Sequence, residues 1–160
     1  MLWLRSAFFT LAGPGTVAGW VPLWLSTRPG GRLDLGPARW IGVPLLVVGG
    51  AGLLWCIWDF GRVGRGTLAP VDAPRFVVRG GLYRLARNPM YLSVLTVLLG
   101  EALLLRSLRI MAWAAIMATA FHLFVLAYEE PTLRRKFGSD YEAYCRAVPR
   151  WLPRAGRNAG

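Results

Sequence analysis

The sequence predicts an all-α integral membrane protein with about four transmembrane helices. Hydrophobic residues make up 55% of the 160 residues, and the mean hydropathy of +0.42 is high for a soluble domain. The apolar residues gather in long uncharged runs, as helices that cross a bilayer require. The net charge of +11 comes from basic residues that flank these runs. This pattern indicates membrane topology and not a nucleic-acid-binding face.

Four apolar runs predict the transmembrane helices within one membrane domain, residues 1–160. Each is close to the length of about 20 residues that spans a bilayer, although the third is short and contains an acidic residue. The predicted spans are Ser6–Thr27, Trp40–Trp58, Pro89–Leu105 and Ile110–Tyr128.

The first run could be mistaken for a secretory signal, because Arg5 precedes its apolar core. The run is long, contains Pro14 between two glycines, and lacks a clean cleavage site of small residues. We therefore expect a retained membrane helix that Pro14 kinks, with neighbouring helices satisfying the freed carbonyl.

The polar segments predict the orientation. Four spans would place the loop 61–87, the tail 129–160 and both termini on one side of the membrane. That side would hold most of the 19 basic residues. The positive-inside rule then places the loop, the tail and both termini in the cytoplasm, and we expect a bacterial inner-membrane protein.

Several kinds of site are disfavoured. Cys56, Cys145 and the single histidine do not have the spacing of a metal site, so no metal is expected. The glycine-rich segment Gly61–Gly66 has neither a βαβ pattern around it nor a following Lys-Ser/Thr pair, so it does not predict a nucleotide-binding loop. No nucleic-acid partner is expected.

Two polar clusters border the last two spans. The first, Val78–Tyr91, precedes the third span, and the second, Tyr128–Pro131, follows the fourth. A helical hairpin would bring both clusters to the same side of the membrane. Within the first, spacing favours Asn88 as a helix N-cap with Pro89 at the first helical position, although the Asn88 amide could instead contact a ligand.

Glu129 and Glu130 are expected at the C-terminal end of the fourth helix. There the helix dipole disfavours each carboxylate by a few tenths to about 1 kcal/mol. A nearby cation would relieve this cost, and so would a new helix beginning at Pro131. A positively charged ligand and a plain ion pair remain equal alternatives. The candidate arginines are Arg75, Arg79, Arg84 and Arg87.

Glu101 lies within the third span, where an ionisable residue is a functional candidate by default. His122 in the fourth span is the titratable residue nearest in depth, so a direct pair is possible, but a structural hydrogen bond is favoured. Tyr83 and Tyr91 could line a ligand or serve as interfacial anchors, and the anchor role is favoured.

Taken together, these residues resemble a known family. The order G-G-L-Y-R-x-x-R-N-P-M-Y, a membrane hairpin, and E-E-P-x-L-x-x-x-F-G-x-x-Y-x-x-Y-x-x-x-V-P-R-W is similar to the integral-membrane methyltransferases. These include isoprenylcysteine carboxyl methyltransferases and phospholipid N-methyltransferases. The resemblance covers residues 66–154 with order and spacing preserved.

The resemblance implies that S-adenosylmethionine is the methyl donor and that the loop and tail bind it in the cytoplasm. Glu129 could neutralise the positive charges of the donor, and the arginine-rich loop or a helix N-terminus could receive its carboxylate. Glu129 or Glu130 could also accept a proton from an amine acceptor. The cofactor-lining positions that the resemblance implies are Arg75, Phe76, Val77, Val78, Tyr83, Asn88, Pro89, Met90, Tyr91 and Glu129.

Two departures from the family pattern bear on the acceptor. Asn88 stands where the commoner motif has histidine, which excludes a proton shuttle there. Val125 stands where the isoprenylcysteine enzymes place an arginine for the substrate carboxylate, which disfavours a prenylcysteine substrate.

We therefore expect a methyltransferase of the isoprenylcysteine carboxyl methyltransferase type, acting on a lipophilic acceptor that enters from the bilayer. A phospholipid or amine N-methyltransferase of the same family is the first alternative. The other is a non-catalytic membrane protein whose basic face binds anionic membrane lipids or a partner.

Overall fold

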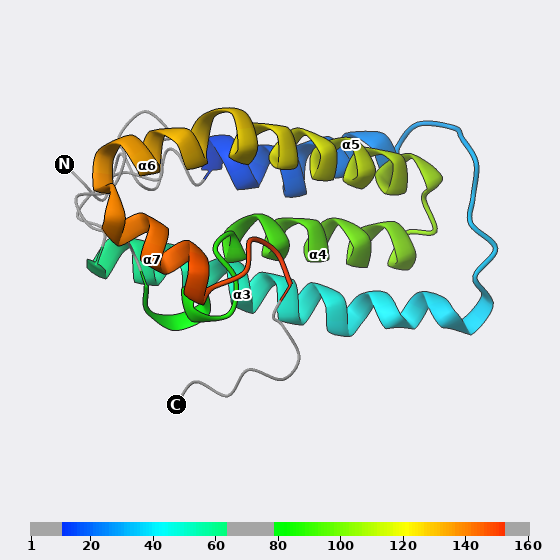
Figure 1. Ribbon diagram of the computed structural model, residues 1–160. Helices are drawn as coiled ribbons and strands as arrows, with labels where there is room; N and C mark the ends of the chain where they lie inside the picture. Colours follow the sequence, from blue (N-terminus) through cyan, green and yellow to red (C-terminus); the bar gives the residue numbers. More distant parts are fainter. Residues whose placement is uncertain (1–10, 64–78, 153–160) are drawn as a thin grey trace.

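The structure is a computed structural model that describes residues 11–63 and 79–152 (Figure 1). All the regular elements in these ranges are helices, as the sequence predicts. The α4 helix lies between α3 and the long helix that begins with α5, and the N-terminal helix contacts both α4 and α5 (Figure 1). The elements are η1 Leu11–Trp20, α2 Val21–Ser26, η2 Gly36–Ile41, α3 Gly42–Val63, η3 Gly81–Arg84, α4 Pro89–Leu104, α5 Leu108–Phe124, η4 Val125–Glu129, α6 Glu130–Phe137 and α7 Ser139–Ala147.

Two helices of the described residues are long and apolar enough to cross a membrane: Gly36–Asp59 and Leu108–Phe137. Only 17% of the residues in the most apolar part of each are buried. Both helices therefore expose large apolar side chains, such as Leu54 and Ile116, that water would solvate poorly. The α4 helix is apolar but shorter, and that it and the N-terminal helix also cross a membrane remains a prediction.

Small residues bring α3 and α4 into close contact. Gly49 is buried, and a Cβ atom placed there would lie 2.8 Å from the backbone nitrogen of Val97 and 3.0 Å from the carbonyl oxygen of Ser93. Gly42 and Gly100 face each other in the same way further along the pair. Membrane helices associate through such surfaces, where small residues allow backbones to approach.

The replacement Gly49→Ala is expected to destabilise the α3–α4 pair. Its methyl group would meet the backbone of α4 and force the helices apart, at a cost of about 1–3 kcal/mol. Gly50→Ala is the matched control, because no atom lies within 4 Å of the Cβ that it adds. Thermal unfolding in detergent should show a lower midpoint for Gly49→Ala only. Equal midpoints for the two variants would contradict this account of the contact.

The helix of the fourth predicted span does not end at Tyr128. It continues through a single π-turn, η4, into α6, so that one helix runs from Leu108 to Phe137. In the π-turn the N–H of Glu130 donates to the carbonyl of Val125, five residues earlier. This widened turn comes directly before Pro131, which lacks an N–H and would break regular α-helical bonding. The expectation that the helix stops at Glu129 and Glu130 was wrong, because the π-turn carries it past Pro131. The alternative, in which a further helical segment begins at Pro131, is close to what is seen, since α6 starts at Glu130 with Pro131 in its first turn.

The tail folds back onto one end of the bundle. Gly138, with φ of +50°, reverses the chain after α6, and α7 then buries one face that includes Tyr141, Tyr144 and Val148. Figure 1 shows α6 and α7 at the same end as the start of α4. The loop between α2 and α3 and the α4–α5 turn lie at the opposite end.

Candidate functional site

The two polar clusters of the sequence meet in the structure. The hydroxyl of Tyr91, in the first turn of α4, donates a hydrogen bond to the Glu129 carboxylate at 3.1 Å. The Tyr91 ring stacks on Phe121 of α5, with 4.6 Å between the ring centroids. Because the ring is held on one side by Phe121, its hydroxyl is fixed toward Glu129. The hairpin arrangement predicted for these clusters is present.

Glu130 is enclosed by arginines. Its side chain is 7% exposed and lies 3.1 Å from Nη1 of Arg87, whose side chain is 10% exposed. Arg150 of the tail adds a two-pronged contact, with Nε 2.6 Å and Nη2 3.0 Å from the two carboxylate oxygens. These hydrogen bonds raise the pKa of Arg150 above its ordinary value. Glu130 therefore joins α6, the loop before α4 and the tail.

The two adjacent glutamates thus have different surroundings. Glu130 has the plain ion pair that the sequence offered as one alternative, with Arg87 among the predicted partners. Glu129 has the hydrogen bond from Tyr91 and no ion pair with any described residue. Of the two carboxylates, Glu129 is thus the one that no described basic residue neutralises.

Asn88 does not cap α4. It occupies the N-cap position before Pro89, but its side chain makes no capping bond. Its Nδ2 instead donates to the carbonyl of Arg150 at 3.1 Å, and the neighbouring N–H of Arg87 donates to the carbonyl of Pro149 at 2.9 Å. The prediction of a side-chain cap was wrong: the side chain is turned toward the tail, where Nδ2 donates to Arg150, and its amide oxygen accepts no bond from the first turn. Asn88 and Arg87 thus bind the tail to the N-terminal end of α4, which is called the mouth of α4 below.

Tyr83 is half-buried in η3. Burial raises the pKa of its phenol well above the ordinary value, and the nearby Cys56 and Glu129 act in the same direction. Its carbonyl accepts a hydrogen bond from the hydroxyl of Tyr144 at 2.7 Å. Tyr83 is therefore a half-buried side chain whose phenol lies near Glu129.

Asp59 at the end of α3 supplies a further acidic group that the sequence analysis did not single out. Its Oδ2 atom is buried and has no hydrogen-bond partner among the described residues. The oxygen lies against Gly81, whose φ of +54° favours glycine and where any Cβ would overlap the carboxylate. A buried acceptor without a donor indicates that a further polar group belongs here.

The remaining predicted positions have different outcomes. Pro89 is buried and Met90 half-buried in the first turn of α4. Arg75, Phe76, Val77 and Val78 lie outside the described residues, as do the glycines of the 64–66 segment.

Glu101 and His122 do not pair. The Nδ1 of His122 accepts a hydrogen bond from the Trp151 indole at 3.2 Å, and the buried Oε2 of Glu101 has no partner among the described residues.

Sequence reasoning missed Arg150 and Tyr144 as parts of the site. Arg150 binds Glu130 and Asn88 at once, through its side chain and its carbonyl. Both residues lie in the tail, where they stand in the Y-x-x-Y-x-x-x-V-P-R-W pattern. The spacing of that pattern was the available signal, but spacing along the chain does not show which side chain the tail presents to α6.

The chain matches the protein family described as phospholipid methyltransferase over residues 37–140. This range contains η2, the α3–α5 helices, η4, α6 and the start of α7, and therefore both glutamates and the mouth of α4. No curated protein and no solved structure gives a significant match.

Proposed function

Because the chain belongs to the phospholipid methyltransferase family, we propose that it transfers a methyl group from S-adenosylmethionine to a lipophilic acceptor in the membrane. The matched range covers well over half of the 160 residues and includes the whole α4–α5 hairpin. The exposed apolar surfaces of α3 and α5 support a membrane location.

The observation that carries the proposal is the contact between Tyr91 and Glu129. It holds a carboxylate that has no ion pair with a described residue beside the mouth of α4, where the half-buried Tyr83 ring also lies. The methyl donor carries a sulfonium and an ammonium group, so a fixed and unpaired carboxylate suits it. The unpartnered oxygen of Asp59 adds a second acceptor near Tyr83 and Gly81, which fits a donor rich in N–H groups.

For methyl transfer the protein mainly has to align the methyl donor with the acceptor. The sulfonium makes the methyl carbon reactive, so that attack by the acceptor breaks the carbon–sulfur bond and leaves the electron pair on sulfur. Glu129, held by Tyr91, would orient the positive end of the donor. The docked tail and its bonds to Asn88 and Arg87 would exclude water from the mouth of α4. Of the two expected proton acceptors we propose Glu129, since Glu130 forms ion pairs with Arg87, Arg134 and Arg150.

A lipid amine is the acceptor that we propose. Val125, where the isoprenylcysteine enzymes have an arginine, is 1% exposed. It offers no charge to a substrate carboxylate, whereas an amine needs only alignment with the methyl group and loss of a proton. An isoprenylcysteine-type acceptor is the second candidate. The experiment below tests acceptors of both classes.

Calorimetric titration of S-adenosylhomocysteine into the detergent-purified protein tests the proposal. We expect saturable binding that changes little with ionic strength, because the site is largely buried. Transfer of labelled methyl groups into membrane lipid extracts and into a prenylcysteine should then identify the acceptor class. Absence of binding by a folded preparation would refute the proposal. It would favour the non-catalytic protein with a basic, lipid-binding face, whose lipid binding should weaken steeply with salt.

A further inference from the structure

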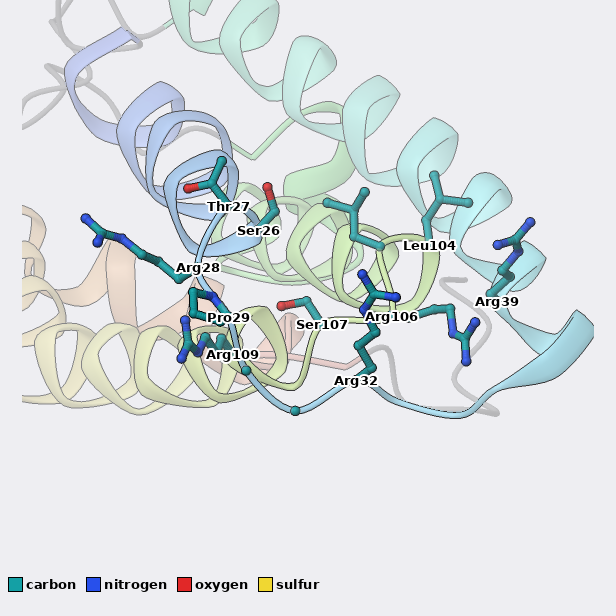
Figure 2. Close-up of a pocket in the computed structure, with 13 residues that line it drawn as sticks. Ser26, Thr27, Arg28, Pro29, Arg32, Arg39, Leu104, Arg106, Ser107 and Arg109 are labelled. Atoms are coloured by element: carbon teal, nitrogen blue, oxygen red, sulfur yellow. The ribbon is translucent and has the colours of Figure 1, made fainter.

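An arginine-lined cavity lies at the end of the bundle opposite the candidate site. It has a volume of about 590 Å³ and is formed by the loop after α2 and the α4–α5 turn (Figure 2). Figure 2 shows Arg28 and Arg39 at opposite sides of the cavity, with Arg32, Arg106 and Arg109 between them. The rest of the lining is Ser26, Thr27, Pro29, Gly30, Gly31, Leu104, Leu105 and Ser107.

The positive charge of this cavity is poorly balanced. Among the described residues one carboxylate, that of Asp34, pairs with these arginines, 3.1 Å from Nη2 of Arg106. The Asp34 side chain is 96% exposed, so water weakens even this pair. Arg28 and Arg39 instead stack on Trp24 and Trp40. Several guanidinium groups gathered here without carboxylates repel one another unless an anion joins them.

Arg106 is held in place at a conformational cost. It is the one described residue other than glycine with a positive φ, at 54°, a conformation that costs an ordinary residue about 1–2 kcal/mol. Glycine or asparagine would fit this turn better. The Arg106 side chain donates from Nε to the carbonyl of Leu33 at 2.9 Å, which directs the guanidinium along the loop. Residues with a strained backbone conformation cluster at functional sites, and the bond to Leu33 holds this arginine side chain in one orientation.

The loop is built to hold this arrangement. Arg32 and Ser107 form an antiparallel bridge, the N–H of Leu33 donates to the carbonyl of Arg106, and the N–H of Leu108 donates to that of Gly31. Gly30 leaves room for the Arg109 guanidinium, which a Cβ at that position would displace. The loop and the turn therefore form one unit, and the arginines do not depend on independent flexible segments.

Membrane topology does not explain these arginines. The positive-inside rule places basic residues on one side of a membrane and keeps the loops of the other side poor in them. Here basic residues occur at both ends of the bundle, and the five at this end converge on one cavity. Large apolar side chains, including Trp40, Leu105 and Leu108, are exposed next to it. The cavity therefore lies where headgroups meet acyl chains if the helices cross a bilayer.

We propose that this cavity binds a phosphate group, carried either by a lipid headgroup or by a soluble phosphate. Guanidinium groups bind phosphate oxygens through paired N–H donors, and Arg32, Arg106 and Arg109 could share one anion. The exposed apolar side chains around the cavity would contact acyl chains in the lipid case. The site is separate from the candidate methyl-transfer site, and its occupation does not depend on methyl-donor binding.

Two probes distinguish the sources of phosphate: short-chain dihexanoyl phosphatidic acid and inorganic phosphate. Each is titrated into the full-length protein in neutral detergent at constant ionic strength, with calorimetric detection. Saturable binding of the lipid alone supports a lipid headgroup, and equal binding of both supports the phosphate group by itself. Failure of a folded preparation to bind either probe saturably overturns the proposal.

Charge-matched variants locate the binding. Replacing both Arg32 and Arg109 by glutamine is expected to weaken probe affinity by about tenfold or more. Replacing the exposed Arg135 and Arg146 at the other end removes the same charge and should leave the affinity unchanged. An equal loss in both variants would show binding to the general charge of the protein and overturn the proposal.

The variant Asp34→Asn provides an independent measurement that does not risk the fold, since this side chain is almost fully exposed. It removes the carboxylate that competes for Arg106, so probe affinity should rise by about two- to fivefold. A lower affinity would overturn the proposal.

Discussion

Replacing Glu129 by glutamine is expected to weaken the binding of S-adenosylhomocysteine and S-adenosylmethionine by about tenfold to a hundredfold. The substitution keeps the shape of the side chain and an oxygen that can accept from the Tyr91 hydroxyl. It removes the charge that has no ion pair with any described residue. Calorimetric titration of purified protein measures the affinity. The affinity for S-adenosylmethionine should fall more than that for S-adenosylhomocysteine, because only S-adenosylmethionine carries the sulfonium.

Two controls separate charge from packing. Tyr91→Phe removes the hydrogen bond to Glu129 but keeps the ring on Phe121, so affinity should fall by only about two- to tenfold. Glu142→Gln removes an exposed carboxylate of α7 and should change nothing. If Glu129→Gln bound both ligands as tightly as the original protein, Glu129 would not belong to the donor site. The methyl-transfer proposal would then need another anion.

Replacing Glu130 by glutamine is expected to destabilise the fold by about 3–5 kcal/mol, the cost of breaking a buried ion pair from one side. Arg87 would keep a buried positive charge without its partner, and Arg150 would lose its two-pronged contact. Thermal unfolding in detergent should show a large decrease in midpoint. Protease cleavage of the tail should become faster, because Arg150 holds the tail against α6.

Glu142→Gln is again the matched control, and its unfolding midpoint should not change. If Glu130 only holds Arg87 and Arg150 in place and does not take part in methyl transfer, a second result is expected. At a temperature where Glu130→Gln remains folded, methyl-transfer activity should fall together with donor affinity while the rate at saturating donor is largely kept. A variant of normal stability that binds the donor normally but transfers no methyl group would contradict this role. It would support the proton-accepting role expected from the sequence.

The helical class and its main elements follow from the sequence because hydrophobic runs of this length have few alternatives. The second and fourth predicted spans correspond to helices that are long and apolar enough to cross a membrane. The membership in a methyltransferase family also follows from the motif spacing, and the family match confirms it.

Two local predictions failed because tertiary contacts decided them. Asn88 has the local signature of an N-cap, but a carbonyl from more than 60 residues later lies within reach of its amide. Glu129 and Glu130 were expected at a helix end because the apolar run stops at Tyr128, and the π-turn at Val125–Glu129 carries the helix past Pro131. Neither the distant acceptor nor the widened turn can be read from local propensity.

The sequence identified the candidate residues but not the different role of each. The paired glutamates and the nearby arginines were recognised, but the sequence treats the two carboxylates alike. The fold distinguishes them, because Arg87 and Arg150 both reach Glu130 and leave Glu129 to Tyr91. The orphaned Asp59 oxygen likewise depends on η3 folding against the end of α3.

The docking of Arg150 has a consequence for biosynthesis. A chain emerges from the ribosome with its N-terminal part first, so the membrane hairpin is made before the segment that contains Pro149 and Arg150. Until that segment arrives, Glu130 has Arg87 but lacks Arg150, and the Asn88 side chain and the N–H of Arg87 lack the carbonyls that accept from them in the folded protein. Docking of the tail thus follows synthesis of the hairpin. A nascent chain without Pro149 and Arg150 would have both glutamates in place but not the contacts that hold the tail.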